Sequence, residues 1–150
     1  MTLQETLLLD SNSPSHLVWG TGRRAGMPAL ATRDAAGYLV GKVLGKTLKA
    51  HRVVFYLVHG YWPDQVDHIN GVRDDNRPDN LRDVGRLENR HNRVHKGYSW
   101  NAKWGKYIAY ISHGGTRRHL GGFATPEEAR MAYLLAKRQL HTTAPERCYA

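Results

Sequence analysis

The segment Val66-Asp67-His68-Ile69-Asn70-Gly71 decides how this chain of 150 residues is interpreted. It places a carboxylate directly before a histidine, and two further asparagines follow at Asn80 and Asn89. Hydrolysis of a phosphodiester needs a group that takes a proton from water and a cation that neutralises the charge growing on the phosphate. One acid, one histidine and two asparagines can fill those roles, so we take these four residues as one candidate site.

The chemistry of the side chains agrees with this interpretation. Histidine has an unperturbed pKa near ~6.5, so His68 can accept a proton at neutral pH. Magnesium prefers oxygen ligands and keeps several waters, so one carboxylate and one amide oxygen, completed by phosphate and water, would form a sufficient shell. The stretch from Gly71 to Asp79 is rich in turn formers and suits a hairpin loop that brings distant residues together. Singly, each residue would be an ordinary turn or surface residue, and only the combination favours a nuclease.

The order and spacing of these residues resemble the HNH (His-Asn-His) endonucleases, especially phage homing-type members with asparagine at the third motif position. The resemblance implies a ββα-metal (His-Me finger) hairpin. It makes His68 the general base, Asp67 and Asn89 the metal ligands, and Asn80 the brace that orients the loop bearing His68. Relatives commonly read Thr-Arg-Ser-Glu before the last ligand, where this chain has Gly85-Arg86-Leu87-Glu88. The metal-bearing helix is therefore expected to start differently.

Residues 52–59 give two conflicting signals. They are rich in β-branched and aromatic side chains, so propensity alone favours a strand. Phage relatives have a similar Ala-His-Arg segment that opens a helix ending at glycine, matched here by Ala50-His51-Arg52 and Gly60. We follow the resemblance and expect a helix. It would leave His51 either near the phosphate or as a packed or solvent-facing residue.

Composition indicates a polyanionic partner. The chain has 22 Lys and Arg against 13 Asp and Glu, a net charge of +9 and a pI of about 9.9, so its field should attract nucleic acid. Nine basic and two acidic residues lie between Arg82 and Arg118. Such a stripe is often only a solvated face, but this one begins beside the candidate site. The DNA contacts that we expect along it are Arg86, Arg90, Arg93, Lys103, Trp104, Lys106, Arg117 and Arg118.

The chain is long enough for two small domains. We expect a nuclease domain at residues 10–95, with its ββα-metal core at about residues 64–95, and a second domain at residues 96–141. Residues 1–9 and 142–150 are interpreted as tails without a readable role.

Several classes of protein are disfavoured. No apolar run approaches the ~20 residues needed to span a bilayer, and no basic start marks a signal peptide. The single cysteine, Cys148, excludes an internal disulfide and a cysteine zinc cluster. We therefore expect a cytoplasmic protein (in the bacterial host, if it is phage-encoded), with neither a membrane partner nor a small-molecule substrate.

The start of the first domain predicts a β-rich fold. Residues 15–19 read as a short strand before a glycine-rich loop, with Trp19 as a core residue. Residues 37–44 and 47–51 flank Gly45-Lys46, which suits a two-residue hairpin turn.

The second domain predicts three strands and one helix. Strand-like runs at residues 96–100, 106–111 and 117–123 suggest an antiparallel sheet. Thr125 with Glu128 forms a capping box before an amphipathic helix that ends near Leu140 and should cover one face of the sheet. The other face would carry Trp104, Lys106, Tyr110 and Arg117 or their neighbours.

This segment resembles the Apetala-type or ethylene-response-factor (ERF) DNA-binding domain. The shared features are the run from Trp104 to Ala109, the run from His119 to Ala129, and Ala132-Tyr133. The resemblance implies that the sheet docks in the major groove of duplex DNA, with arginine forks suited to guanine and lysine to phosphate.

Together these inferences predict an α+β protein that hydrolyses DNA. His68 would deprotonate water while one divalent ion, Mg²⁺ or alternatively Mn²⁺, is held by Asp67 and Asn89. One site per chain predicts that a monomer nicks one strand, whereas a double-strand break would need a dimer or two sequential events. We expect the protein to be a monomer or weak dimer. The alternatives are a catalytically silent DNA-binding or regulatory protein on the same scaffold, and a nuclease for structured RNA.

Overall fold

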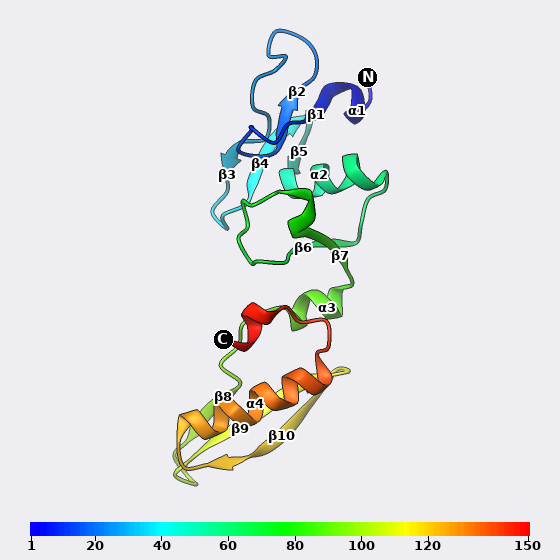
Figure 1. The fold of residues 1–150 in the computed structure, drawn as a ribbon. Coiled ribbons are helices and arrows are strands. Elements are labelled where there is room, and N and C mark those ends of the chain that lie inside the picture. The colour runs from blue at the N-terminus through cyan, green and yellow to red at the C-terminus, as the bar shows by residue number, and fades with distance from the viewer. The chain divides into compact units, whose positions relative to one another are not determined.

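The computed structural model describes the whole chain, from Met1 to Ala150. The chain folds as two compact units, Met1–Arg86 and Leu87–Ala150 (Figure 1). The boundary lies upstream of the expected one between residues 95 and 96. The reason is that the backbone carbonyls of Asn92 and Arg93 accept hydrogen bonds from the C-terminal part of the chain, which ties this segment to the second unit.

The first nine residues are part of the fold of the first unit, and their interpretation as a tail is corrected. Helix α1 (Leu3–Thr6) begins at a capping box formed by Thr2 and Glu5. Strand β1 (Leu7–Leu9) then pairs antiparallel with β2 (Leu17–Trp19). The side chain of Leu7 is buried in the core, so hydrophobic burial fixes the segment.

A three-stranded antiparallel sheet follows, in the order β3–β4–β5. Its strands are β3 (Thr32–Arg33), β4 (Leu39–Val43) and β5 (Lys46–Lys49). The turn was expected at Gly45-Lys46 but lies one residue earlier, because Val43 pairs with Lys46. Leu44 and Gly45 both have positive φ, 48° and 78°, which is the backbone of a type I′ turn.

Helix α2 (Ala50–His59) confirms the helix that the resemblance implied, and strand propensity alone was misleading here. It ends at Gly60, whose φ of 79° provides the left-handed cap. Ala50, Val53 and Val54 are buried at helical spacing, so the β-branched side chains form part of the buried face of the helix. They pack in one core cluster with residues of the strands: Leu7, Leu17, Leu39, Val43, Val66 and Leu81.

The hairpin that carries the candidate site closes the first unit. Strand β6 (Gln65–His68) pairs antiparallel with β7 (Leu81–Val84), with Asp67 opposite Arg82 and His68 opposite Leu81. A loop joins the strands and ends in a short 3-10 helix, η1 (Pro78–Asn80). His68 therefore ends one strand, and Asn80 directly precedes the other.

The second unit has the three strands and the helix that the sequence predicts. After α3 (Arg86–His91) come β8 (Tyr98–Asn101), β9 (Lys106–His113) and β10 (Thr116–Phe123), in the sheet order β10–β9–β8. Helix α4 (Pro126–Leu140) lies along one face of this sheet (Figure 1).

Capping and burial explain the position of α4. The predicted capping box is present, with the Thr125 side chain accepting from the Glu128 backbone N–H at 3.3 Å. Ala129 and Tyr133 are buried on the helix, as are Ala109 and Ile111 on β9. The apolar stripe therefore covers the sheet as expected.

The C-terminal residues are also ordered, so the interpretation of residues 142–150 as a tail is corrected. They include a short 3-10 helix, η2 (Glu146–Tyr149), in which Cys148 is completely buried. The Cys148 thiol donates to the backbone carbonyl of Asn92 at 2.9 Å. No helix in this chain is long and apolar enough to cross a membrane.

Candidate active site

His68 is held in one orientation by a buried asparagine. Its Nε2 lies 3.2 Å from Oδ1 of Asn76, a fully buried residue of the hairpin loop. The amide nitrogen of Asn76 points to the backbone carbonyl of Ser15 at 3.5 Å, which places the amide oxygen towards His68. Because that oxygen can only accept a hydrogen bond, Nε2 of His68 carries the hydrogen and the lone pair is on Nδ1.

The electrostatic setting keeps His68 uncharged. Burial lowers the pKa of His68, and the hydrogen bond with Asn76 and the negative charges of Asp67 and Asp75 offset part of that effect. An imidazole with a lowered pKa is neutral at physiological pH, which is the form that a general base requires.

Asp67 is buried directly before His68 and is paired with an arginine across the hairpin. Arg82 on β7 donates from Nε and Nη2 to Oδ2 of Asp67, at 3.1 and 2.9 Å. The antiparallel register places the two residues opposite each other, so the pair follows from the strand pairing. The sequence showed Arg82 only as part of the basic stripe, and its contact with Asp67 was missed.

Asn80 makes three hydrogen bonds with the loop that connects the two strands. Its Oδ1 accepts from the backbone N–H of Asn70 at 3.0 Å. Its Nδ2 donates to Oδ1 of Asn70 at 3.0 Å and to the backbone carbonyl of Asp75 at 2.8 Å. These contacts are those of a residue that ties both ends of the loop together.

The acidic centre of the loop is also fixed. The carboxylate of Asp75 accepts from Nδ2 of Asn70 at 2.7 Å and from Nε and Nη2 of Arg77 at 2.9 and 2.8 Å. These hydrogen bonds lower the pKa of Asp75 to about 2, and the bond with Arg77 is the largest cause. Asp75 is therefore a charged anchor of the loop at all physiological pH values.

His51, the first-turn histidine of α2, lies beside His68. The ring centroids are 5.0 Å apart, and the ring of Tyr38 lies at 5.0 Å from that of His51. Nδ1 of His51 is buried without a hydrogen-bond partner. Burial is the largest cause that lowers the pKa of His51 to about 3. The structure therefore gives His51 a packed and neutral state, and a phosphate contact by this residue stays a prediction.

The structure brings His68, Asp67 and Asn80 together in the first unit. Asn89 lies on α3 and, like Arg90 and Arg93, belongs to the second unit. The donor chemistry of one carboxylate and one amide oxygen fits Mg²⁺. The assignment of Asn89 as a ligand rests on the sequence resemblance.

The sheet of the second unit has one face that α4 does not cover. Side chains alternate along a strand, so Lys106 and Tyr110 on β9 share this face with Arg117, which pairs with Ser112. The Arg117 guanidinium carbon lies 3.4 Å from the centre of the Tyr110 ring. Arg118 pairs with the buried Ile111 and is thus on the opposite face.

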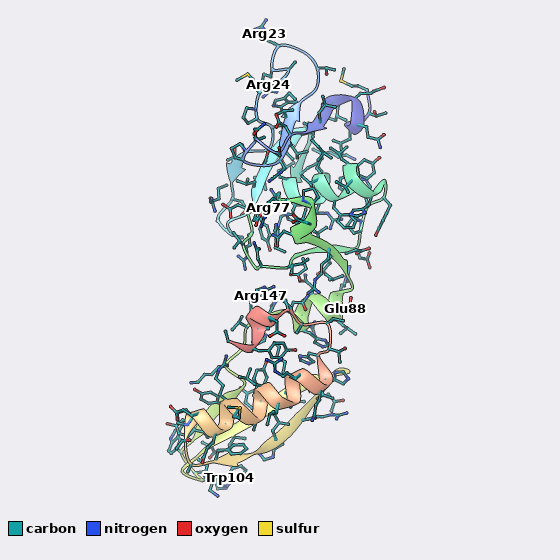
Figure 2. All side chains as sticks on the ribbon, viewed as in Figure 1. Arg23, Arg24, Arg77, Glu88, Trp104 and Arg147 are labelled. Atoms are coloured by element: carbon teal, nitrogen blue, oxygen red, sulfur yellow. The ribbon has the colours of Figure 1, made fainter.

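A shallow groove lies on this open face. It has a volume of about 470 Å³ and is lined by Trp104, Lys106, Ile108, His119 and Gly122. Trp104, labelled in Figure 2, lies in the turn before β9. It is 60 % exposed, and Lys103 precedes it in the same turn. An exposed tryptophan beside basic residues is suited to contact with nucleic acid.

Comparison with known proteins gives a match for one part of the chain. Residues 48–91 match the model of a family described as HNH endonuclease. The match spans α2, the β6–β7 hairpin and α3, which is less than one third of the chain. No curated protein and no solved structure was found to match.

The matched segment is thus similar to HNH endonuclease domains, a family of nucleases that act on nucleic acid and generally depend on a divalent metal. The match lies outside the sheet of the second unit. It lends no support to the Apetala-type assignment of residues 96–141 or to a phage origin.

Proposed function

We propose that this protein is a metal-dependent DNA endonuclease that hydrolyses one strand of duplex DNA. The observation that carries the proposal is the hydrogen bond between His68 and Asn76 inside the segment that matches the HNH family. It presents a neutral imidazole, which can take a proton from water, beside a carboxylate, which can hold a cation.

His68 is the general base in this proposal. Its Nδ1 takes the proton from the attacking water. The positive charge of the protonated ring is then balanced by Asp67 and Asp75, whose negative charges already favour the protonated form. Asn76 keeps Nε2 as a donor throughout, so the ring does not change its tautomer between turnovers. Asn80 has a positioning role, because its bonds to Asn70 and Asp75 hold the loop on which Asn76 lies.

Asp67 and Asn89 would hold the divalent ion, Mg²⁺ or alternatively Mn²⁺. Bound there, the ion supplies positive charge to the phosphate and to the leaving 3′-oxygen. Arg82 fixes the orientation of the Asp67 carboxylate through its two N–H groups. Products of this chemistry would carry 5′-phosphate and 3′-hydroxyl ends.

The second unit would hold the DNA. We propose that the face of its sheet left open by α4 contacts the duplex through Trp104, Lys106 and Arg117, as an Apetala-type sheet would. Lys103 and the arginines near α3 (Arg86, Arg90 and Arg93) would add phosphate contacts, whereas Arg118, on the opposite face of the sheet, would contribute only to the overall positive charge. Each phosphate neutralised releases counterions, so binding should weaken by orders of magnitude over a modest rise in salt.

A plasmid assay tests the proposal. Supercoiled plasmid is incubated with the protein and Mg²⁺, beside a sample with chelator and two variants, His68→Ala and His59→Ala. His59 is an exposed histidine at the end of α2 and serves as the matched control. We expect open circles from the wild type and His59→Ala, and none from His68→Ala or with chelator.

Three results would contradict the proposal in different ways. DNA binding without cutting by the wild type, on plasmid and on phage genomic DNA alike, would favour a silent DNA-binding protein. Cutting by His68→Ala at the wild-type rate would remove His68 as the base. Preferential cutting of structured RNA in a competition would change the substrate class.

A further inference from the structure

Three histidines meet in the second unit, apart from the nuclease chemistry described above. His91 is the last residue of α3, His113 is the last residue of β9, and His141 follows the end of α4. Each offers a ring nitrogen, and these nitrogens lie within 4.8 Å of one another. Three separate elements therefore direct imidazoles to one point.

The hydrogen bonds of His141 leave one ring nitrogen ready to bind a cation. Its Nε2 lies 2.9 Å from the backbone carbonyl of Ser112. Since a carbonyl only accepts, Nε2 carries the hydrogen and the lone pair is on Nδ1. That Nδ1 is buried and has no hydrogen-bond partner. A histidine that donates one N–H to a backbone carbonyl and keeps the other nitrogen open has the typical arrangement of a metal ligand.

His113 repeats the same feature. Its Nδ1 is also buried and has no hydrogen-bond partner. Buried polar atoms in native proteins are normally paired, so two unpaired nitrogens at one point need an explanation. A metal ion bound by both nitrogens would supply it.

The separations between the rings suit coordination after small rotations. The rings of His91 and His141 are stacked with centroids 3.7 Å apart, and the His113 ring lies 5.9 Å from each. With Zn–N bonds of about 2.05 Å, the nitrogens of a tetrahedral site lie ~3.4 Å apart. The candidate nitrogens lie within 4.8 Å of one another, so the rings must tilt to converge on one ion.

The surroundings favour the neutral form of two of these imidazoles, His91 and His141, because burial lowers the pKa of both. Burial is the first cause that lowers the pKa of His141, and the charge of Lys137 acts in the same direction. Neutral imidazole is the form that binds metal. A cavity of about 540 Å³, lined in part by His91, Ser112 and His141, gives an ion and a water ligand access to the cluster.

We propose that His91, His113 and His141 form a zinc site with three imidazole ligands and a fourth position for water. The donors are all nitrogen, which suits Zn²⁺ and not Mg²⁺ or Ca²⁺, whose ligands are oxygens. The site therefore differs in chemistry from the oxygen-ligand site of the proposed nuclease and does not depend on it.

The site would serve to anchor α3. This helix has six residues, none of which is buried, so little hydrophobic packing holds it. A metal bond at His91 would tie its C-terminal end to the end of β9 and to the end of α4. Asn89, the proposed nuclease ligand, lies on the same short helix, so zinc would order the segment that carries it.

Zinc titration tests the proposal, with calorimetry and chelator competition in buffer that contains excess Mg²⁺. The Asp67→Asn protein is used as background, so that the nuclease site does not add a second ion. We expect one Zn²⁺ per chain. His91→Gln should weaken binding by at least ~100-fold, more than the loss of an outer-shell partner costs. The control His95→Gln changes an exposed histidine that lines the same cavity, and should bind as tightly as its parent.

A spectroscopic measurement covers the case in which a variant does not fold. X-ray absorption at the zinc edge of the unmutated chain should show three imidazole ligands, and Co²⁺ in place of zinc should give the visible spectrum of a tetrahedral site. Fewer than three imidazoles, no binding near one equivalent, or equal loss in His91→Gln and His95→Gln would overturn the proposal. Because none of these readouts needs DNA cleavage, they are independent of the proposed nuclease function.

Discussion

The side-chain oxygen of Asn76 lies 3.2 Å from Nε2 of His68, at the end of strand β6. Asn76 is fully buried, and its amide nitrogen points to the Ser15 carbonyl, so the side chain cannot turn without losing a partner. The orientation of the proposed general base is thus set by a residue of the loop and not by its own strand.

Replacing Asn76 should therefore slow the reaction without affecting DNA binding. In Asn76→Ala, His68 loses the acceptor that fixes its tautomer, and we expect kcat to fall by about tenfold or more, within the range of general-base effects. KM should stay unchanged. Plasmid nicking under steady-state conditions measures both, and Asn12→Ala, at an exposed asparagine, is the control. A fall in DNA affinity with kcat unchanged would contradict the positioning role.

The two faces of the second sheet give a matched pair of arginines. Arg117 stacks on Tyr110 on the open face, whereas its neighbour Arg118 points to the other face. Arg117→Gln should weaken DNA binding by at least about tenfold, as expected for an arginine that contacts bases or phosphates. Arg118→Gln should have a much smaller effect. Fluorescence anisotropy at several salt concentrations measures both affinities. Equal losses would show that overall charge, and not this face, determines binding.

Buried His51 makes stability depend on pH. Its pKa is about 3 in the folded protein and near ~6.5 in the unfolded chain, so between these values only the unfolded chain binds the proton. Stability is therefore complete above pH ~6.5 and is lost as the pH falls towards 3. From pH 7 to pH 5 the contribution of His51 amounts to about 2 kcal/mol.

Urea denaturation at several pH values measures this contribution. The free energy of unfolding of the wild type should fall more steeply with acid than that of His51→Gln. The variant will be less stable at pH 7, so the slopes and not the absolute values are compared. His59→Gln, which removes an exposed histidine from the same helix, controls for the loss of one titrating group. Parallel slopes for wild type and His51→Gln would contradict the prediction.

Predictions that depended on residues close together in the sequence were correct. Thr125 and Glu128 are three residues apart, and their capping box formed as predicted. Asp67 and His68 are adjacent, so their joint position on one strand follows from the chain itself. Residues 52–59 show the limit of propensity, because their β-branched side chains were buried on a helix once tertiary packing was available.

Contacts between distant residues could not be predicted. Asn76 looked like an ordinary turn residue, and only the folded loop places it against His68. His91, His113 and His141 have no common spacing, since they come from a short helix, a strand end and a helix end. The burial of Leu7 and Cys148 likewise depends on partners elsewhere in the chain, so both segments looked like tails.

Gly97 before β8 provides a test of packing in the second unit. Its φ is +79°, and a Cβ at this position would lie 2.0 Å from Cγ of Tyr133, a buried residue of α4. Gly97→Ala must therefore displace the ring or the strand in addition to straining the backbone, and we expect a loss of about 3 kcal/mol or more. Gly105→Ala is the matched control, because that glycine also has positive φ but a Cβ added to it would meet nothing within 4 Å. Its cost should be about 1 kcal/mol, from backbone strain alone. Hydrogen exchange of the amides of β8 and β9 reports on this unit directly, and equal protection in the two variants would show that Tyr133 does not pack against Gly97 in solution.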